Sequence, residues 1–194
     1  MGPQREQIGP PIGPPVLLSG KVHGVRRWEV FVDPAGALRL GGHGDSPWRT
    51  AGETTWAECL KGRFRGGVKH KTPPPAPRCH CGLYALHPWM IGTENWAHWL
   101  PPGRQLAVAG IVECWGQVQL HAEGVRAQYA RPIRLVVIGA PLDSDYGRFV
   151  RRLARAHAAD VRAFRTLADL SRHCASSKLG LPRRLVETLL ELDP

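Results

Sequence analysis

Hydrophobic and polar residues alternate along two parts of the chain, which is the pattern of β-strands that bury one face. Residues 22–32 predict a strand, residues 33–36 a turn, and residues 37–40 the returning strand of a hairpin. Between residues 106 and 138 the alternation resumes, reverses at Glu123-Gly124 and ends in an apolar run. This second part predicts a three-stranded antiparallel meander, and we expect the hairpin to join the same sheet.

The period changes after Pro141. Apolar residues between Tyr146 and Ala168 recur at helical spacing, and residues 182–192 form a last amphipathic helical pattern. Residues 54–60 predict one helical turn, and residues 93–99 a short helix. The expected fold class is therefore α+β: a small, bent antiparallel sheet or partial barrel with a metal-stapled loop and C-terminal helices.

Composition supports a loop-rich protein of three parts. The chain holds 22 glycines and 18 prolines, about a fifth of its 194 residues, where average usage gives about 12%. We expect a flexible Pro/Gly-rich arm over residues 1–20, a β-rich module over 21–141 and a helical extension over 142–194. The sequence shows no signal-peptide core and no run of 18 apolar residues, so we expect a cytoplasmic location and no membrane partner.

Four residues within a short stretch suggest a metal site: Cys59, His70, Cys79 and Cys81. Thiolate and imidazole ligands suit zinc, and a closed four-coordinate shell is the usual structural arrangement. His80 is an alternative to His70. An open or catalytic metal site, iron in place of zinc, and an absence of metal with buried cysteines and a solvated histidine are the other possibilities.

The spacing of the last two cysteines imposes a bend. In a straight strand, Cys79 and Cys81 have Cα atoms about 6.5 Å apart, whereas sulfurs on one zinc ion are only about 3.8 Å apart. Gly82 follows directly and can adopt the backbone angles of a tight bend. Cys114 and Cys174 lie in apolar segments and are expected to be packing residues.

The formal net charge of +10 points to an acidic partner such as nucleic acid, because a basic surface neutralises phosphates and releases counterions. A GC-rich genome also raises the content of arginine, alanine, glycine and proline together. Genome composition is therefore the alternative explanation of the positive charge. The alternative partner is a protein, or a second copy of the chain, bound by the C-terminal helices. The candidate phosphate contacts, in a basic loop and on a helix, are Lys61, Arg63, Arg65, Lys69, Lys71, Arg148, Arg152, Arg155 and Arg162.

A second constellation is His121, Glu123 and Arg126. A His-x-Glu near cysteine pairs is similar to the zinc deaminase signature, but here the cysteines come first and are separated by one residue. A small enzyme with a site at these residues is thus the second alternative. A solvated or hydrogen-bonded turn is the other interpretation.

The chain holds seven tryptophans, and most are expected in the core. Trp89, Trp96 and Trp99 follow the metal motif near the basic loop, so base stacking is the other role that they could have.

Two elements resemble a small family of bacterial proteins without an assigned activity, chiefly from high-GC Gram-positive species. They are the Cys-x-Cys-Gly-x-Tyr-Ala element at 79–85 and the Trp-Gly-x-Val-x-x-His-x-x-Gly-x-Arg-Ala element at 115–127. The resemblance covers about residues 22–139 and implies a shared β-rich module. It implies no mechanism, and the helices after Pro141 lie outside it.

Overall fold

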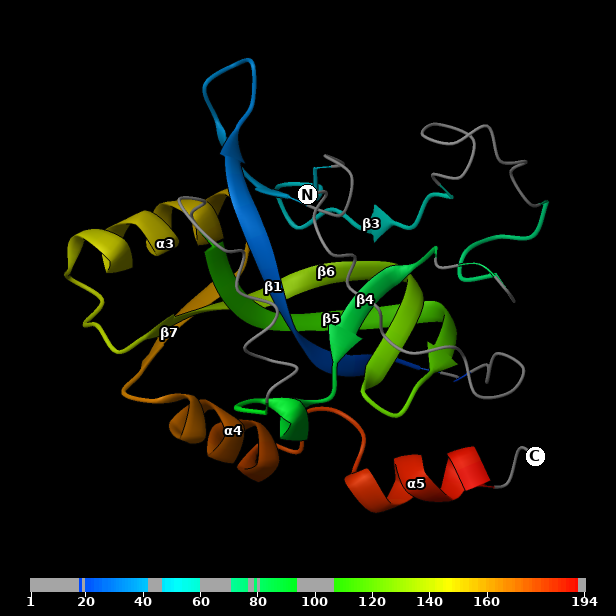
Figure 1. Ribbon diagram of the computed structural model, residues 1–194. Helices are drawn as coiled ribbons and strands as arrows, with labels where there is room; N and C mark the ends of the chain where they lie inside the picture. Colours follow the sequence, from blue (N-terminus) through cyan, green and yellow to red (C-terminus); the bar gives the residue numbers. More distant parts are fainter. Residues whose placement is uncertain are drawn as a thin grey trace, which may run out of the picture.

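One mixed sheet of seven strands organises the described part of the chain (Figure 1). The computed structural model describes residues 18, 20–41, 47–59, 71–76, 79, 81–93 and 107–191. Its elements, in chain order, are β1 (Val22–Val32), β2 (Leu38–Gly41), β3 (Thr55–Trp56), β4 (Leu83–Leu86), the 3-10 helix η1 (Pro88–Met90), β5 (Ala107–Leu120), β6 (Gly124–Ile138), α3 (Asp145–Ala156), β7 (Asp160–Phe164), α4 (Leu167–Ser176) and α5 (Arg183–Glu191).

Four of the strands close a ring. β1 pairs with β5 and touches β4 at Val25 and Leu86, while β6 pairs with both β5 and β4. Two glycines permit this closure, because a Cβ at Gly24 would lie 2.6 Å from the Ala85 Cβ and one at Gly124 would collide with the Ala85 carbonyl oxygen. The α+β expectation of a bent, mostly antiparallel partial barrel with C-terminal helices is confirmed.

Residues 106–138 were expected to form a three-stranded meander, but the structure has two long strands there. β5 and β6 pair along almost their whole length and bend at two register shifts. Pro132, the partner of Val112, lies next to one shift, and a β-bulge is a place where a strand tolerates proline, so it does not end the strand. Gly116 lies at the other with φ +79°, a conformation that favours glycine.

The helical pattern from Tyr146 to Ala168 is interrupted by a strand. α3 ends at Ala156, and β7 then pairs with β6 in parallel, so α3 is a crossover helix between neighbouring strands. Exposed and half-buried residues alternate over the first four residues of β7, which is the strand period. The expectation that Arg162 shares a helical stripe with Arg155 is therefore wrong, because Arg162 lies on β7. The domain boundary at residue 141 stays a prediction.

Two other expectations have clear outcomes. The helical turn expected over residues 54–60 is wrong, because Thr55 and Trp56 form β3 and pair with β6. The last helix is confirmed as α5. The helix expected over residues 93–99 and the arm over residues 1–20 lie almost wholly outside the described residues. No helix in the described ranges has the length and apolarity to cross a membrane.

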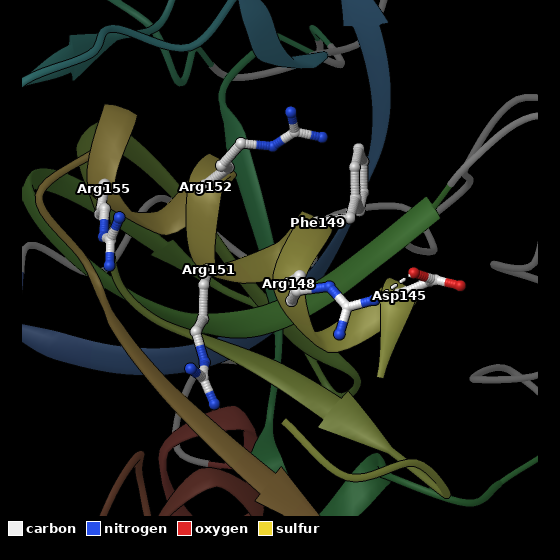
Figure 2. Close-up of a pocket in the computed structure, with 6 residues that line it drawn as sticks. All are labelled: Asp145, Arg148, Phe149, Arg151, Arg152 and Arg155. Carbon is white, nitrogen blue, oxygen red and sulfur yellow. Dashed lines mark hydrogen bonds and ion pairs between the residues drawn. The ribbon is translucent and has the colours of Figure 1, made fainter. Parts of the chain in front are cut away.

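Apolar side chains on the two faces of the sheet form two cores. On one face, Val112 and Leu135 pack in a cluster with Leu153 of α3. On the other, Ile111 and Val136 pack in a cluster with Leu170 of α4. Figure 1 shows α3 and α4 on opposite sides of the sheet. Because the inner face of α3 is buried, its outer face is left to solvent, where arginines extend from it (Figure 2).

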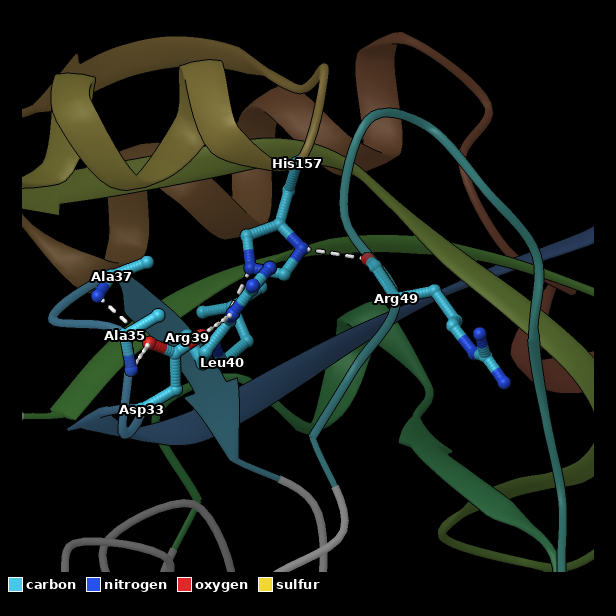
Figure 3. A network of polar contacts seen from close by, with 7 residues as sticks. All are labelled: Asp33, Ala35, Ala37, Arg39, Leu40, Arg49 and His157. Atoms are coloured by element: carbon cyan, nitrogen blue, oxygen red, sulfur yellow. Dashed lines mark hydrogen bonds and ion pairs between the residues drawn. The ribbon is translucent and has the colours of Figure 1, made fainter.

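His157, at the C-terminal end of α3, ties three segments together (Figure 3). Its Nδ1 donates to the Arg49 carbonyl oxygen over 2.9 Å, and its Nε2 accepts the Leu40 N–H over 3.3 Å. Both bonds are made only by the neutral ring with its proton on Nδ1. The ring is fully buried, and this burial lowers the pKa of His157 below its usual value.

We therefore expect the protein to lose stability as the pH falls below about 6.5. In that range the unfolded chain binds a proton at His157 that the folded chain excludes. The free energy of unfolding therefore decreases as the pH falls. Urea unfolding at pH 7.5 and pH 5.5 measures the effect. His157→Gln should reduce the difference in the free energy of unfolding between the two pH values. His87, whose pKa is also lowered by burial, should account for a further part of that difference. An equal difference in the wild type and the variant contradicts the assignment.

Candidate metal centre

Three cysteine thiols converge in the structure. The Cys59 and Cys79 Sγ atoms are 3.8 Å apart, and the sulfurs of Cys59, Cys79 and Cys81 all lie within 4.8 Å of one another. All three side chains are buried and, with Ala76, they form a small core of their own. The sequence expectation that these cysteines meet is confirmed, whereas His70 and its alternative His80 lie outside the described residues.

Strand pairing explains why Cys59 and Cys81 meet. β3 leaves the sheet beside Tyr129 of β6, and β4 enters it beside Ala127, so the segment between them starts and ends at the same place on β6. Cys59 lies shortly after β3, and Cys81 lies shortly before β4. The two thiols are therefore held together where the chain leaves the sheet and where it returns. We call the described residues between β3 and β4 the cysteine loop.

The bend between the last two cysteines is also visible. The Cys79 N–H bonds to the Ala76 carbonyl oxygen over 3.2 Å, as in a tight turn. Gly82 has φ +135°, as a bend after Cys81 requires. A Cβ at Gly82 would lie 3.1 Å from the Arg126 Cβ, so the glycine also makes room for a close packing contact.

This geometry could hold a metal ion. With metal–sulfur bonds of about 2.3 Å and tetrahedral angles, sulfurs on one zinc are about 3.8 Å apart, and the Cys59–Cys79 separation matches this. Burial and the neighbouring thiols raise the pKa of Cys81 to about 12. A bound cation would stabilise the thiolates, because metal binding replaces thiol protons. Cys114 and Cys174 lie in the two sheet cores, away from this group, as expected of packing residues.

A buried arginine braces the cysteine loop. The Arg126 Nη1 donates to the Cys79 carbonyl oxygen, its Nη2 donates to the Gln119 Oε1, and its Nε donates to the His121 Nε2 over 3.0 Å. The Arg126 guanidinium also lies 5.8 Å from the centre of the Tyr84 ring. One side chain thus ties the loop to both strands of the β5–β6 hairpin.

The structure brings His121 and Arg126 together and buries them, with 3% and 1% of their surfaces exposed. The Glu123 backbone carbonyl accepts the His87 N–H over 2.9 Å, and the His121 carbonyl bonds to the His87 Nε2 over 3.0 Å. The sequence left open whether these residues form a solvated or a hydrogen-bonded turn. His121 and Arg126 are buried and hydrogen-bonded, so they are not solvated. Because the Arg126 guanidinium is bonded to protein acceptors, its evident role is to position the loop.

The basic residues fall in two groups. Arg148, Arg152 and Arg155 lie on the exposed face of α3, where Arg151, which the sequence stripe omitted, joins them. An open hollow of about 650 Å³ lies against this face (Figure 2); the residues known to line it are Asp145, Arg148, Phe149, Arg151, Arg152 and Arg155. Lys71 is exposed, and Lys61, Arg63, Arg65 and Lys69 lie outside the described residues.

The α3 arginines differ in their partners. Arg148 pairs with Asp145 and with the Asp143 carbonyl. Arg151, Arg152 and Arg155 are exposed and have no carboxylate partner within the described ranges. Arg162, on β7, has its guanidinium 3.4 Å from the His173 Nε2 and 5.6 Å from the centre of the Phe164 ring.

Comparison with protein-family models, with curated proteins and with solved structures gives no match for this chain. The resemblance to a bacterial family therefore stays a prediction, and the function has to be argued from the residues of this protein.

Replacing Arg126 tests its bracing role. Arg126→Gln leaves the Cys79 carbonyl and Gln119 without their charged donor, so we expect the free energy of unfolding to fall by roughly 3 kcal/mol. Arg131→Gln is the control, because the Arg131 side chain is 42% exposed and its carboxylate partner, Glu113, keeps Lys21 as a second partner; its cost should stay below about 1 kcal/mol. Equal losses in urea unfolding of the two variants contradict a special role for Arg126.

Proposed function

We propose that this protein is a non-enzymatic binding module whose cysteine loop is stapled by zinc and whose basic surface binds nucleic acid. The sulfur separation of 3.8 Å between Cys59 and Cys79 is the observation that supports the metal. Zinc is favoured over magnesium or calcium because thiolates are soft ligands. Its role is structural, since three of the four tetrahedral positions would be taken by protein sulfurs and the sequence offers His70 as a candidate for the fourth.

Zinc also suits the surroundings of the site. A Zn²⁺ ion with three thiolates and one neutral imidazole carries a net charge of −1, which is costly to bury without a counter-charge. The buried Arg126 guanidinium donates to the carbonyl of Cys79, a proposed ligand, and so supplies a positive charge next to the site.

Metal analysis tests this part of the proposal. Purified, reduced protein should contain about one zinc per chain, as expected for a single closed site, and Cys79→Ser should lower the content to near zero. Cys174→Ala is the matched control, because Cys174 is also buried but lies on α4, in the second core of the sheet. Zinc retained by Cys79→Ser, or another metal in the wild type, contradicts the assignment.

The exposed face of α3 supports the second part of the proposal, the binding of nucleic acid. Arg151, Arg152 and Arg155 offer three guanidinium groups that pair with no carboxylate among the described residues, since Asp145 of the same hollow pairs with Arg148. Guanidinium groups match phosphate geometry through paired N–H donors. Because they are exposed, they bind phosphates without the desolvation cost of a buried charge. Such contacts carry no base information, so we expect binding that depends weakly on sequence.

The exposed apolar residues favour nucleic acid over a protein partner. Within the described ranges, the exposed large hydrophobic residues are Val32, Trp56 and Leu185, which lie on three different elements. A protein-docking surface needs a contiguous apolar patch. The C-terminal helices offer Leu185 alone of these three, which weakens the adaptor alternative.

Binding should weaken steeply with salt, because each phosphate contact releases a counterion. The double variant Arg152→Glu with Arg155→Glu should reduce the affinity for a labelled DNA. It should also reduce the magnitude of the slope of log K against log salt by about 2. Arg165→Glu with Arg184→Glu changes the net charge equally at two exposed positions off α3 and is the control. Salt-independent binding, or equal losses for both double variants in fluorescence anisotropy, contradicts the α3 interface.

A further inference from the structure

Three aromatic side chains stand in a row across adjacent strands. Trp56 of β3 lies opposite Tyr129 of β6, and Tyr129 lies opposite Trp115 of β5. Residues directly opposite in an antiparallel pair project from the same face of the sheet. The Trp115 and Tyr129 ring centres are 6.1 Å apart, which confirms their contact. We call Trp56, Tyr129 and Trp115 the aromatic row.

The aromatic row is at the surface, unlike the tryptophans of the core. Trp56 is 46% exposed, and Tyr129 and Trp115 are partly exposed. Trp28 and Trp48, in contrast, are buried and pack edge to face. Large aromatic residues left at the surface in a group mark a binding site more often than isolated ones do.

Cations lie at both ends of the row. The Arg49 guanidinium is 4.0 Å from the centre of the Trp56 ring, and the Lys21 ammonium is 5.9 Å from the centre of the Trp115 ring. Beside the row, Lys21 and Arg131 share the single carboxylate of Glu113. These contacts around the row thus involve three cations and one carboxylate, a set that complements phosphate.

We propose that the aromatic row is a stacking platform for single-stranded nucleic acid, with bases on the rings and phosphates on Arg49, Lys21 and Arg131. This inference rests on the proposed nucleic-acid binding and names its ligand. Aromatic side chains flanked by cations bind single strands without strong sequence preference, because every base has a π-face. A duplex does not fit this chemistry, since both faces of each internal base are covered by neighbouring bases.

The platform is connected to the α3 interface. The Ala51 N–H bonds to the Ala156 carbonyl oxygen over 2.7 Å, and the His157 Nδ1 donates to the Arg49 carbonyl. The segment that carries Arg49 is thus fixed to the end of α3, next to Arg155. The Arg49 guanidinium itself lies over the Trp56 ring, so these backbone bonds hold the segment that carries one cation of the platform.

Binding of oligothymidine and of a duplex by the full-length protein tests the platform. Anisotropy is measured with a labelled single strand of about 15 nucleotides, within the usual site size, and with a duplex of equal length. Trp56→Leu keeps an apolar side chain but removes the π-face, and Trp56→Phe keeps the π-face. We expect Trp56→Leu to weaken single-strand binding by about 5- to 100-fold, the value of one base stack, with Trp56→Phe much closer to the wild type and duplex binding unchanged.

The outcomes separate the two proposals. If the wild type binds both nucleic acids and neither Trp56→Leu nor Trp115→Leu affects single-strand binding, the platform is wrong while nucleic-acid binding stands. If Trp56→Leu weakens single-strand and duplex binding equally, the loss is not base stacking, and the platform is again wrong. If the wild type binds neither, both proposals fall. Circular dichroism and urea unfolding of each variant show whether the fold is kept.

Discussion

Strand β6 pairs with four other strands, and both proposed sites depend on that pairing. β5 lies along one edge of β6, while β4, β3 and β7 pair with successive stretches of it. β3 and β4 pair with neighbouring stretches of the same edge of β6. The chain between them therefore leaves and re-enters the sheet at one point, which brings Cys59 and Cys81 together. The same pairing of β3 with β6 sets Trp56 opposite Tyr129. A change in this register would disturb both the thiols and the aromatic row.

The buried Arg126 connects the cysteine loop energetically to the β5–β6 hairpin. A charge with 1% of its surface exposed is unfavourable unless its donors are satisfied. Its acceptors come from Cys79, Gln119 and His121, so the cost of burial is offset only when the cysteine loop sits against the β5–β6 hairpin. This arrangement orders the loop from inside the sheet, while a metal ion would order it at the thiols. With the proposed metal bound, the two restraints would act on adjacent residues and would reinforce each other.

Several elements could be predicted because their signals are local. The hairpin of β1 and β2 follows from alternation and a Pro-Gly turn, and the convergence of the three cysteines follows from their spacing and ligand chemistry. β7 was missed because five residues with Val161 and Phe164 three apart fit a helical period as well as a strand, and only pairing with β6 decides between them. The burial of His121 and Arg126 was missed because charged residues at a predicted turn normally face water. The aromatic row depends on register across three strands and on the bulge at Gly116, neither of which a single sequence specifies.

The parallel pairing of β7 with β6 has a consequence for how the chain is divided. Residues Arg134–Val136 of β6 pair with β5 on one side, and residues Arg134–Ile138 pair with β7 on the other. A protein shortened after Pro141 would lose β7 and α3 together, leaving a row of unpaired backbone groups beside the uncovered side chains of Leu135 and Val137. Such open edges recruit strands from other molecules. The C-terminal quarter of the chain thus shields the sheet against self-assembly.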